Sequence, residues 1–204
     1  KANEKASLEL WLMFIDYAKA FDTVKHQRLW KALLDLGIPR HLVSIIRGLY
    51  KHATGVVRVD DQHTDPFPFK KGVRQGCLIS PLLFNVAGET IMRAVSNTLP
   101  DAGLALGDML ISNVRYADDT TLLETSKEKL ETLAEAVKDE SLDFGLKISE
   151  SKTNVMAMNG DGIVKLGGTE IESVDQFKYL GSMIRMRDPS SHEIKIRLAT
   201  AKSV

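Results

Sequence analysis

The feature that most restricts the fold of this chain is a pair of adjacent acids between two strand-like segments, in the stretch VRYADDTTLL from Val114 to Leu123. A hairpin turn is the simplest explanation, because Asp is common in turns. Turns of two residues favour Asn-Gly or Asp-Gly, however, and two like charges repel at close range unless a cation lies between them. The sequence therefore predicts a hairpin with Asp118 and Asp119 at its tip, and leaves open whether these acids serve the turn or a metal ion.

A further acid, Asp16, ends an apolar segment that starts at Leu8 and that we expect to form a buried strand. If this strand end lies beside the hairpin, Asp16 and Asp118 converge at one edge of the sheet. Carboxylate oxygens suit Mg²⁺, and two such ions activate an attacking hydroxyl and stabilise a leaving pyrophosphate. The five histidines are scattered along the sequence, and we expect them on the surface rather than in a competing metal site.

Helices and strands alternate along the rest of the chain. We expect helices over His26–Leu36, over Pro39–Tyr50, from an N-cap at Ser80 through Val95, and from a capping box of Thr125 and Glu128 to Gly145. We expect strands over Thr54–Val59, with a turn at Asp60-Asp61, and over Asn154–Met158, Ile163–Ile171 and Phe177–Ile184, followed by a terminal helix. This mixture predicts an α+β fold in which helices cover one face of a mostly antiparallel sheet.

Composition sets wider bounds on function. The 27 basic and 27 acidic residues of the 204-residue chain cancel, which argues weakly against a dedicated nucleic-acid-binding protein, although local patches matter more than the total. The single cysteine, Cys77, excludes an internal disulfide and fits a reducing compartment. The apolar segment Leu8–Ile15 is too short to span a bilayer. Because the chain starts with Lys1, we expect it to be part of a longer polypeptide.

A glycine-rich loop precedes the third expected helix, in the stretch GVRQGCLISPLLFN from Gly72 to Asn85. Glycines beside Gln75 let the backbone approach a ligand closely, and a helix start attracts phosphate. With this loop and the two acidic motifs, the chain resembles the palm of a reverse transcriptase, and is most similar to those of non-LTR, LINE-type retrotransposons. The five palm motifs of that family correspond, in order, to FIDYAKAFDTV, GVRQGCLISPLLFN, YADD, Gly145–Ile148 with Lys152 and Thr153, and FKYLG from Phe177 to Gly181.

The resemblance implies an RNA-directed DNA polymerase that transfers deoxynucleotides to a primer 3′-hydroxyl on an RNA template. It implies an α+β polymerase palm, an antiparallel sheet backed by helices, over residues 1–186, with 187–204 as the start of the thumb or a connecting helix. Fingers and thumb would be largely missing, so we expect the chain alone to be weakly active or inactive. The implied partners are the RNA template, a DNA primer, dNTPs, and fingers, thumb and endonuclease domains of the same polyprotein, with no membrane. The implied location is intracellular, in the cytoplasm and nucleus.

The resemblance also implies a role for individual residues. Asp16 and Asp118 would bind two Mg²⁺ ions, for which Mn²⁺ could substitute, and would be assisted by Asp119 and the carbonyl of Tyr17. The ring of Phe21 would exclude a ribose 2′-hydroxyl, and Lys152 would act beside the leaving pyrophosphate as a catalytic proton donor. The remaining implied contacts are Gln75, Gly76 and Tyr116 to the incoming nucleotide, and Tyr179, Leu180 and Gly181 to the primer 3′ end.

Simpler interpretations stay open for several of these residues. Phe21 could belong to the core, Lys152 could be a solvated surface cation, and Tyr179-Leu180 could be ordinary packing. We expect Asp22 to be structural, either pairing with a nearby base or capping the helix that begins around Val24-Lys25. For the whole chain, the alternative is a catalytically inactive palm remnant that serves as a nucleic-acid-binding or structural module.

Overall fold

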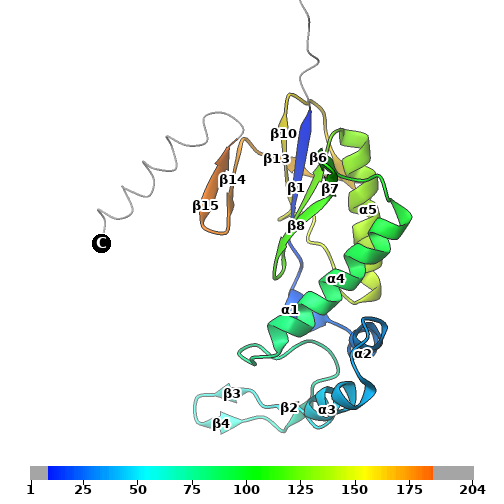
Figure 1. The fold of residues 1–204 in the computed structure, drawn as a ribbon. Helices are drawn as coiled ribbons and strands as arrows, with labels where there is room; N and C mark the ends of the chain where they lie inside the picture. The colour runs from blue at the N-terminus through cyan, green and yellow to red at the C-terminus, as the bar shows by residue number, and fades with distance from the viewer. Residues whose placement is uncertain (1–8, 186–204) are drawn as a thin grey trace, which may run out of the picture. The chain divides into compact units, whose positions relative to one another are not determined.

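The computed structural model describes residues 9–185, which fall into two compact units. Within that range, the first unit comprises residues 9–16, 101–136 and 149–185, and the second comprises residues 17–100 and 137–148. Figure 1 shows the course of the chain through its helices and strands. Each unit is assembled from segments that are distant in the sequence, so long-range contacts define both of them.

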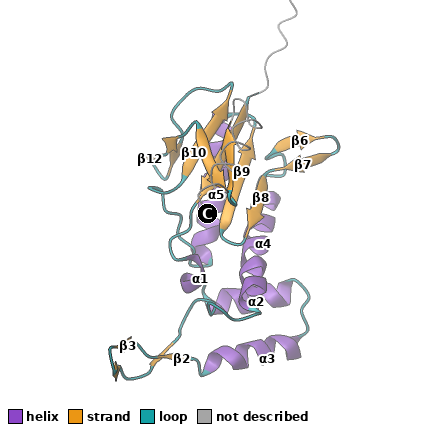
Figure 2. Cartoon of the chain, turned by 90° about the vertical axis from the view of Figure 1, so that its left-hand side faces the viewer, coloured by secondary structure: helices purple, strands orange, loops and turns teal. Residues whose placement is uncertain are grey.

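The first unit is built on a five-stranded sheet with the order β13-β10-β1-β9-β8. Figure 2 labels β10, β9 and β8 of this sheet. Its strands are β1 (Leu10–Ile15), β8 (Asn113–Tyr116), β9 (Asp119–Glu124), β10 (Asn154–Met158) and β13 (Glu172–Ser173). Strand β1 pairs antiparallel with β9 and β10, and β8 pairs antiparallel with β9, whereas the short β13 pairs parallel with β10. The predicted mostly antiparallel sheet is confirmed, as is a strand that ends just before Asp16.

The central strand β1 is buried on both faces, which explains its unbroken apolar sequence. Leu12 and Phe14 alternate with three other buried residues, Trp11, Met13 and Ile15. Leu12 and Phe14 form a cluster with Met156, against which the hairpin of β14 (Gln176–Tyr179) and β15 (Ser182–Arg185) packs. The ring of Phe14 stacks on that of Phe177 with 3.9 Å between centroids, and this contact holds the hairpin on one face of the sheet.

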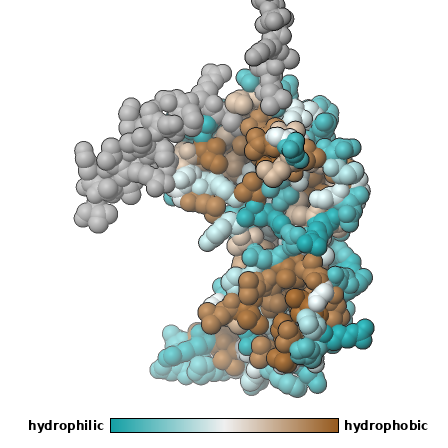
Figure 3. Space-filling view, viewed as in Figure 1, coloured by the Kyte–Doolittle hydropathy of each residue, from teal (hydrophilic) through white to brown (hydrophobic). Residues whose placement is uncertain are grey.

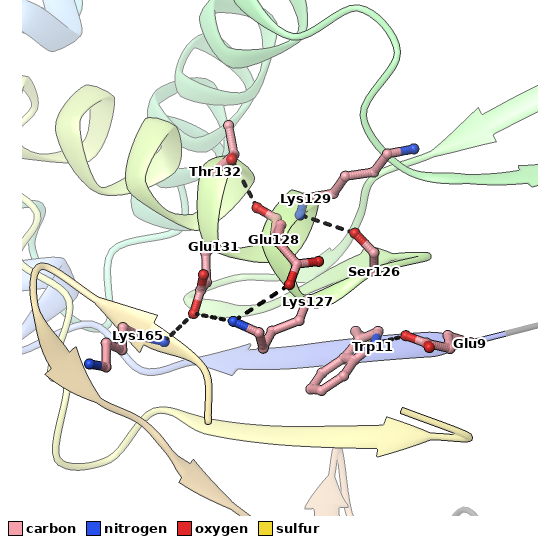
Figure 4. A network of polar contacts seen from close by, with 9 residues as sticks. All are labelled: Glu9, Trp11, Ser126, Lys127, Glu128, Lys129, Glu131, Thr132 and Lys165. Carbon is pink, nitrogen blue, oxygen red and sulfur yellow. Dashed lines mark hydrogen bonds and ion pairs between the residues drawn. The ribbon is translucent and has the colours of Figure 1, made fainter. Parts of the chain in front are cut away.

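Helix α5 (Lys127–Asp143) begins within the first unit, and Ser126 caps its first turn. The hydroxyl of Ser126 accepts a hydrogen bond from the N–H of Lys129 at 3.3 Å (Figure 4). The predicted capping box of Thr125 and Glu128 is therefore wrong by one residue. The residue three positions after the true cap is Lys129, a cation that cannot return the hydrogen bond as Glu would. The predicted end of this helix near Gly145 is confirmed, and Gly145 has a φ of +83°.

Polar contacts join the start of α5 to the neighbouring hairpin of β11 (Lys165–Leu166) and β12 (Thr169–Glu170). Glu131 lies 3.5 Å from the ammonium group of Lys127 and accepts the main-chain N–H of Lys165 at 2.8 Å (Figure 4). The sequence predicted a single strand over Ile163–Ile171. The structure has a hairpin instead, because Gly167 and Gly168 both adopt positive φ and form its turn.

A further hairpin of the first unit, β6 (Leu104–Leu106) with β7 (Met109–Ile111), was not expected from the sequence. It is anchored by Glu124 of β9, whose buried carboxylate accepts the N–H of Gly103 at 2.7 Å and that of Thr125 at 3.1 Å. A buried carboxylate is stable only with such hydrogen bonds. Glu124 is therefore a structural acid, in contrast to the acids at the other end of β9.

The second unit contains α1 (Ala20–Thr23), α2 (His26–Asp35), α3 (Arg40–Lys51) and α4 (Ser80–Thr98). Helix α2 packs against both α3 and α4. The predicted helices in these regions are confirmed, but Ser80 is wrong as an N-cap. The helix begins at Ser80 itself with Ile79 as its N-cap, and the buried Ser80 hydroxyl lies 3.4 Å from the hydroxyl of Tyr50.

Short strands connect α3 to the glycine-rich loop. They pair as β2 (Thr54–Gly55) with β5 (Phe67–Pro68), and as β3 (Arg58–Val59) with β4 (Gln62–His63). The predicted continuous strand over Thr54–Val59 is wrong, because the N–H of Val57 donates to the hydroxyl of Thr64, at 3.0 Å, between the two ladders. The predicted turn at Asp60-Asp61 is confirmed, and Asp60 has a φ of +52°.

Together, the mixed helices and sheets confirm the predicted α+β class. The terminal helix and the boundary between residues 186 and 187 that the sequence predicted lie outside the described residues. No helix within residues 9–185 has the length and apolar character that a bilayer crossing requires.

Candidate active site

Three acids of the first unit lie near one another because of the register between β1 and β9. Ile15 faces Thr120 across these antiparallel strands, so one further step along each strand places Asp16 opposite Asp119. Asp118 immediately precedes Asp119 in the turn that joins β8 to β9. The structure therefore brings Asp16 to the acidic hairpin, although the two positions lie more than 100 residues apart in the sequence.

The turn of this hairpin contains Ala117 and Asp118 rather than the predicted pair Asp118 and Asp119. Tyr116, the last residue of β8, pairs with Asp119, which is therefore the first residue of β9. Ala117 takes the left-handed conformation, with a φ of +54°, where glycine is the easier choice. Asp118 is half-buried in the turn and Tyr116 is 66% exposed beside it. The prediction of two acids at the tip is wrong by one residue, because the ladder of β8 and β9 extends to Asp119.

The acids repel one another in the folded chain. Partial burial, and then the negative charges of Asp118 and Asp16, raise the pKa of the Asp119 carboxyl above its ordinary value. A cation bound between these carboxylates would reverse that repulsion. The negative charges gathered at the end of β1 and the start of β9 therefore favour the binding of a positive ion.

The chemistry of these donors fits Mg²⁺, which prefers carboxylate oxygens and keeps waters or substrate phosphates in the rest of its shell. Within residues 9–185, no group of three or more His, Cys, Asp or Glu side chains is close enough to hold a metal ion by itself. The acids therefore offer part of a coordination shell, which fits an ion whose remaining ligands come from a substrate. The Tyr17 side chain is directed elsewhere, with its hydroxyl 2.9 Å from that of Ser141, so only the Tyr17 carbonyl is a candidate ligand.

A short turn from Ser149 to Thr153 is attached to the end of β1. The N–H of Ser149 donates to the carbonyl of Asp16 at 2.8 Å. The hydroxyl of the fully buried Thr153 lies 3.4 Å from the nitrogen of Asp16, whose N–H it accepts, and donates to the carbonyl of Ser149 at 2.9 Å. Lys152 lies within this turn with an exposed side chain. The turn therefore holds the backbone of Asp16 and places Lys152 in the same local structure.

The predicted primer-binding residues form the end of the hairpin β14–β15. Tyr179 pairs with Ser182, and the turn between them consists of Leu180 and Gly181, with φ values of +48° and +84°. The ring of Tyr179 packs on the cluster around Phe14, which supports the packing interpretation for that side chain. Leu180 is different, because it is 52% exposed and holds a conformation that bulky residues rarely adopt.

In the second unit, Phe21 is half-buried beneath a second aromatic ring. Its ring stacks on that of Phe84 in α4, with 4.7 Å between centroids and an interplanar angle of 10°. Phe84 is itself buried. The packing interpretation of Phe21 is thus correct for one face of the ring, and the partly exposed remainder is available to a ligand.

Gln75 and Gly76 lie in the exposed loop before α4, and Gly76 has a φ of +80°. The amide nitrogen of Gln75 donates to the carboxylate of Asp22 at 3.3 Å. Asp22 therefore pairs with the amide of Gln75 rather than with a basic side chain. The prediction that Asp22 caps the following helix is also wrong, because α2 begins at His26 with Lys25 as its N-cap.

Comparison with known proteins decides the family. Residues 1–184 match the family described as reverse transcriptase (RNA-dependent DNA polymerase). The chain belongs to the reverse transcriptase family. The match includes the acidic hairpin and the glycine-rich loop.

The relatives of this reverse transcriptase chain are polyproteins of non-LTR retrotransposons. The Pol polyprotein of element R2DM from Drosophila melanogaster is 29% identical over 185 residues, which cover 82% of this chain and 17% of the polyprotein. The Pol polyprotein of element R2 from Nasonia vitripennis is 29% identical over 208 residues, covering 93% of this chain and 19% of the relative. The polymerase of the mobile element jockey from Drosophila melanogaster is 29% identical over 178 residues, with coverages of 82% and 19%. The predicted LINE-type branch is confirmed, and the chain spans less than a fifth of these relatives.

Solved structures confirm the reverse transcriptase fold. The apo telomerase of Candida tropicalis aligns with a TM-score of 0.65 at 16% identity, over 92% of this chain and 36% of the telomerase chain. At this identity the likeness concerns the fold alone.

Three residues within the motif stretches were not recognised from the sequence as site-forming. They are Thr153, which holds Asp16, Asp22, which holds Gln75, and Phe84, which supports Phe21. All three carry one detectable signal, because each lies inside a stretch that resembles a family motif. Their partners could not be predicted, because each pair joins positions far apart in the chain.

Proposed function

We propose that this chain is the palm of an RNA-directed DNA polymerase encoded by a non-LTR retrotransposon, and that it works within a longer polyprotein. The observation that carries the proposal is the position of Asp16, Asp118 and Asp119. These acids lie together at the end of β1 and the start of β9, where their charges repel. The reaction is transfer of a deoxynucleotide from a dNTP to the 3′-hydroxyl of a primer paired with an RNA template. It needs positioning and charge stabilisation rather than a protein nucleophile, which agrees with a site built from acids.

Asp16, Asp118 and Asp119, with the carbonyl of Tyr17, would hold two Mg²⁺ ions. When bound, these ions supply a more acidic primer hydroxyl and a neutralised pyrophosphate leaving group. The chain itself contributes the positions of these carboxylates, which are set by the β1–β9 register and by the hydrogen bonds to the backbone of Asp16. Lys152 is exposed on the adjoining turn and would supply the proton that the leaving pyrophosphate takes up.

Other residues of the proposal act on the substrates. Phe21 would exclude the 2′-hydroxyl of a ribonucleotide, supported from behind by Phe84. Gln75, oriented by Asp22, would contact the incoming nucleotide together with Gly76 and Tyr116. The strained turn at Leu180-Gly181, with Tyr179 before it, would contact the primer end.

The test is primer extension on an RNA template by the complete polypeptide in Mg²⁺ buffer. Asp118→Asn should abolish extension, because the amide cannot bind the ion as a carboxylate does. Asp108→Asn is the matched control, since Asp108 is an exposed Asp in the turn of another hairpin of the same unit, β6–β7. Undiminished extension by Asp118→Asn would remove the metal assignment, whereas equal loss in both variants would point to damaged folding.

A further inference from the structure

The second unit has a pocket of about 630 Å³ that is lined mainly by residues of α2 and α3. Its lining combines aromatic rings with cations, and we call it the α2–α3 groove. The residues that line it include His26, Trp30, Arg47, Tyr50, Lys51 and Phe69. This mixture differs from the apolar interior of the unit, and neither the family motifs nor the proposed chemistry accounts for it.

Three aromatic rings of the groove, those of His26, Trp30 and Tyr50, form one connected cluster. Tyr50 meets Trp30 edge-on at 5.5 Å and His26 edge-on at 5.1 Å between ring centroids. His26 is fixed by a hydrogen bond of 2.7 Å between its Nε2 and the carbonyl of Gly72. Phe69, at the edge of the pocket, is 45% exposed, and Trp30 is partly exposed. The groove therefore offers ring surface of Phe69 and Trp30 to a flat ligand, and the contact with the buried Tyr50 holds Trp30 in place.

The cations of the groove come from one face of α3. Ser44, Arg47, Gly48 and Lys51 follow the spacing of a single helical face, and all four line the pocket and are exposed. The exposed apolar residues of this helix, Leu42, Ile45 and Leu49, occupy a different face. Figure 3 shows that apolar residues also gather on the surface of this part of the chain. The basic face that lines the groove is thus separate from the apolar face of the same helix.

Adjoining pockets extend this positive character. One shares Tyr50 and Phe69 with the groove, and another shares His26. The basic residues that line the three pockets are Lys25, Arg28, Arg47, Lys51, Lys70, Lys71 and Arg74, against the acids Asp22 and Asp143. Asp143 is paired with Arg28, and Asp22 with Gln75. A chain with no net charge therefore concentrates positive charge here.

We propose that the α2–α3 groove binds single-stranded RNA, and that the strand is the unpaired part of the template. The groove has the two elements that single-strand sites combine, cations for the phosphates and exposed rings on which bases stack. During templated synthesis the primer is paired, so the unpaired strand available to such a site is the template. This assignment of the strand rests on the proposed function, whereas the binding chemistry rests on the groove alone.

Fluorescence anisotropy with the 204-residue chain and a short labelled oligouridine RNA tests the proposal. The double variant Arg47→Gln/Lys51→Gln should weaken binding about tenfold or more and reduce the salt slope by about 1.4, the value expected for two lost phosphate contacts on a single strand. Phe69→Leu keeps the apolar bulk and removes the ring, and should weaken binding at least about fivefold without changing the slope.

The matched control is Lys129→Gln/Lys165→Gln, which removes the same charge from exposed positions of the first unit. It should bind oligouridine nearly as the unchanged chain does. Equal weakening by the two double variants would overturn the proposal, because net charge alone would then explain binding. Equal competition by double-stranded RNA would also overturn it, because stacking needs unpaired bases.

The failure of this proposal can be told apart from the failure of the proposed function. If the complete polypeptide extends no primer while the chain shows the expected anisotropy changes, the polymerase assignment fails and the RNA site remains. If Asp118→Asn abolishes extension while Arg47→Gln/Lys51→Gln binds oligouridine normally, the polymerase assignment remains and the groove is no RNA site.

Discussion

The hydroxyl of Thr153 lies 3.4 Å from the main-chain nitrogen of Asp16 and accepts its N–H, although the two residues are separated by most of the described chain. The same hydroxyl donates to the carbonyl of Ser149, and the N–H of Ser149 donates back to the carbonyl of Asp16 at 2.8 Å. This closed set of hydrogen bonds fixes the backbone on both sides of the Asp16 side chain. Thr153 thereby acts as a positioning residue for Asp16, because its hydroxyl bonds to the backbone of Asp16 rather than to the carboxylate.

Thr153→Val should weaken the use of Mg²⁺ in primer extension, because Val keeps the shape of Thr but cannot accept the N–H of Asp16. We expect the Mg²⁺ concentration needed for half-maximal extension to rise several-fold, and the free energy of unfolding to fall by about 1–3 kcal/mol, the cost of an unpaired buried group. Thr153→Ser should restore the Mg²⁺ response, since it restores the hydroxyl.

Thr121→Val provides the matched comparison for that experiment. Thr121 is also buried in the first unit, in β9 opposite Phe14, but its hydroxyl has no hydrogen-bond partner among the described residues. The same substitution should therefore leave the Mg²⁺ response unchanged and be neutral or stabilising. A rise in the Mg²⁺ requirement in both variants would show that the effect comes from the core rather than from Asp16.

Sequence patterns predicted those parts of this fold whose signal is local. The unbroken apolar run of β1, the helix α2, and the hairpin turn at Asp60-Asp61 each depend on neighbours in the chain. The errors at Ser80 and Thr125 have a different origin. Each residue is a good cap by type, but a tertiary contact of Ser80 with Tyr50, and the better placed Ser126, determine where the helices begin.

The residues of the candidate site were predicted from motifs, but the geometry of the site was not. The shift of the turn to Ala117 and Asp118 depends on the ladder of β8 and β9, and sequence alone does not give that register. It matters because the register, rather than the hairpin tip, places Asp119 opposite Asp16. The support of Phe21 by Phe84 likewise depends on how α4 packs, which no local pattern reveals.

Asp119→Asn should stabilise the chain in metal-free buffer near neutral pH. The pKa of the Asp119 carboxyl is raised by partial burial and by Asp118 and Asp16, so the folded chain holds this proton more tightly than the unfolded chain does. Stability is then lost as the pH rises through the raised pKa, and Asn removes that loss. We expect a gain of up to about 1 kcal/mol, as for exposed charges, measured by urea unfolding.

The gain from Asp119→Asn should shrink as the pH falls and vanish below the ordinary pKa of Asp, where the Asp119 carboxyl is uncharged in both the folded and the unfolded chain. Added Mg²⁺ should reverse its sign, because only the unchanged chain keeps the full set of acids that binds the ion. Asp108→Asn is the control and should show neither effect. A gain that persists unchanged at low pH would exclude charge repulsion as its cause.

Gly72→Ala should destabilise the second unit more than Gly37→Ala does. Both glycines have positive φ, of +86° and +84°, so both substitutions introduce backbone strain of about 1 kcal/mol. A Cβ at Gly72 would also lie 2.7 Å from the carbonyl oxygen of Asp22, whereas nothing lies within 4 Å of one at Gly37. We expect thermal unfolding to show a clear excess loss for Gly72→Ala, and equal losses would contradict the close approach to Asp22.

Glu124→Gln should cost about 1–3 kcal/mol of unfolding free energy, because one carboxylate oxygen becomes an NH₂ group facing a main-chain N–H. The affected partner is Gly103 or Thr125, depending on the orientation of the amide. Glu170→Gln in the exposed strand β12 is the control and should be nearly neutral. Hydrogen exchange of the Gly103 amide would locate the effect, and unchanged protection there would argue against the anchoring role of Glu124.

Phe21 and Phe84 should together determine how well the polymerase excludes ribonucleotides. Phe21→Ala removes the proposed barrier to the 2′-hydroxyl and should lower the preference for dNTPs over NTPs at least about tenfold. Phe84→Leu leaves Phe21 in place but removes its stacked support at 4.7 Å, so we expect a smaller loss of about two- to tenfold. Phe144→Leu, the same change at another buried position of the second unit, should leave the preference unaltered.

The measurement is the ratio of kcat/KM values for a dNTP and its NTP in primer extension by the complete polypeptide. If Phe84→Leu and Phe144→Leu lower overall extension equally and leave the ratio untouched, the stack is packing alone and Phe21 holds its position without it.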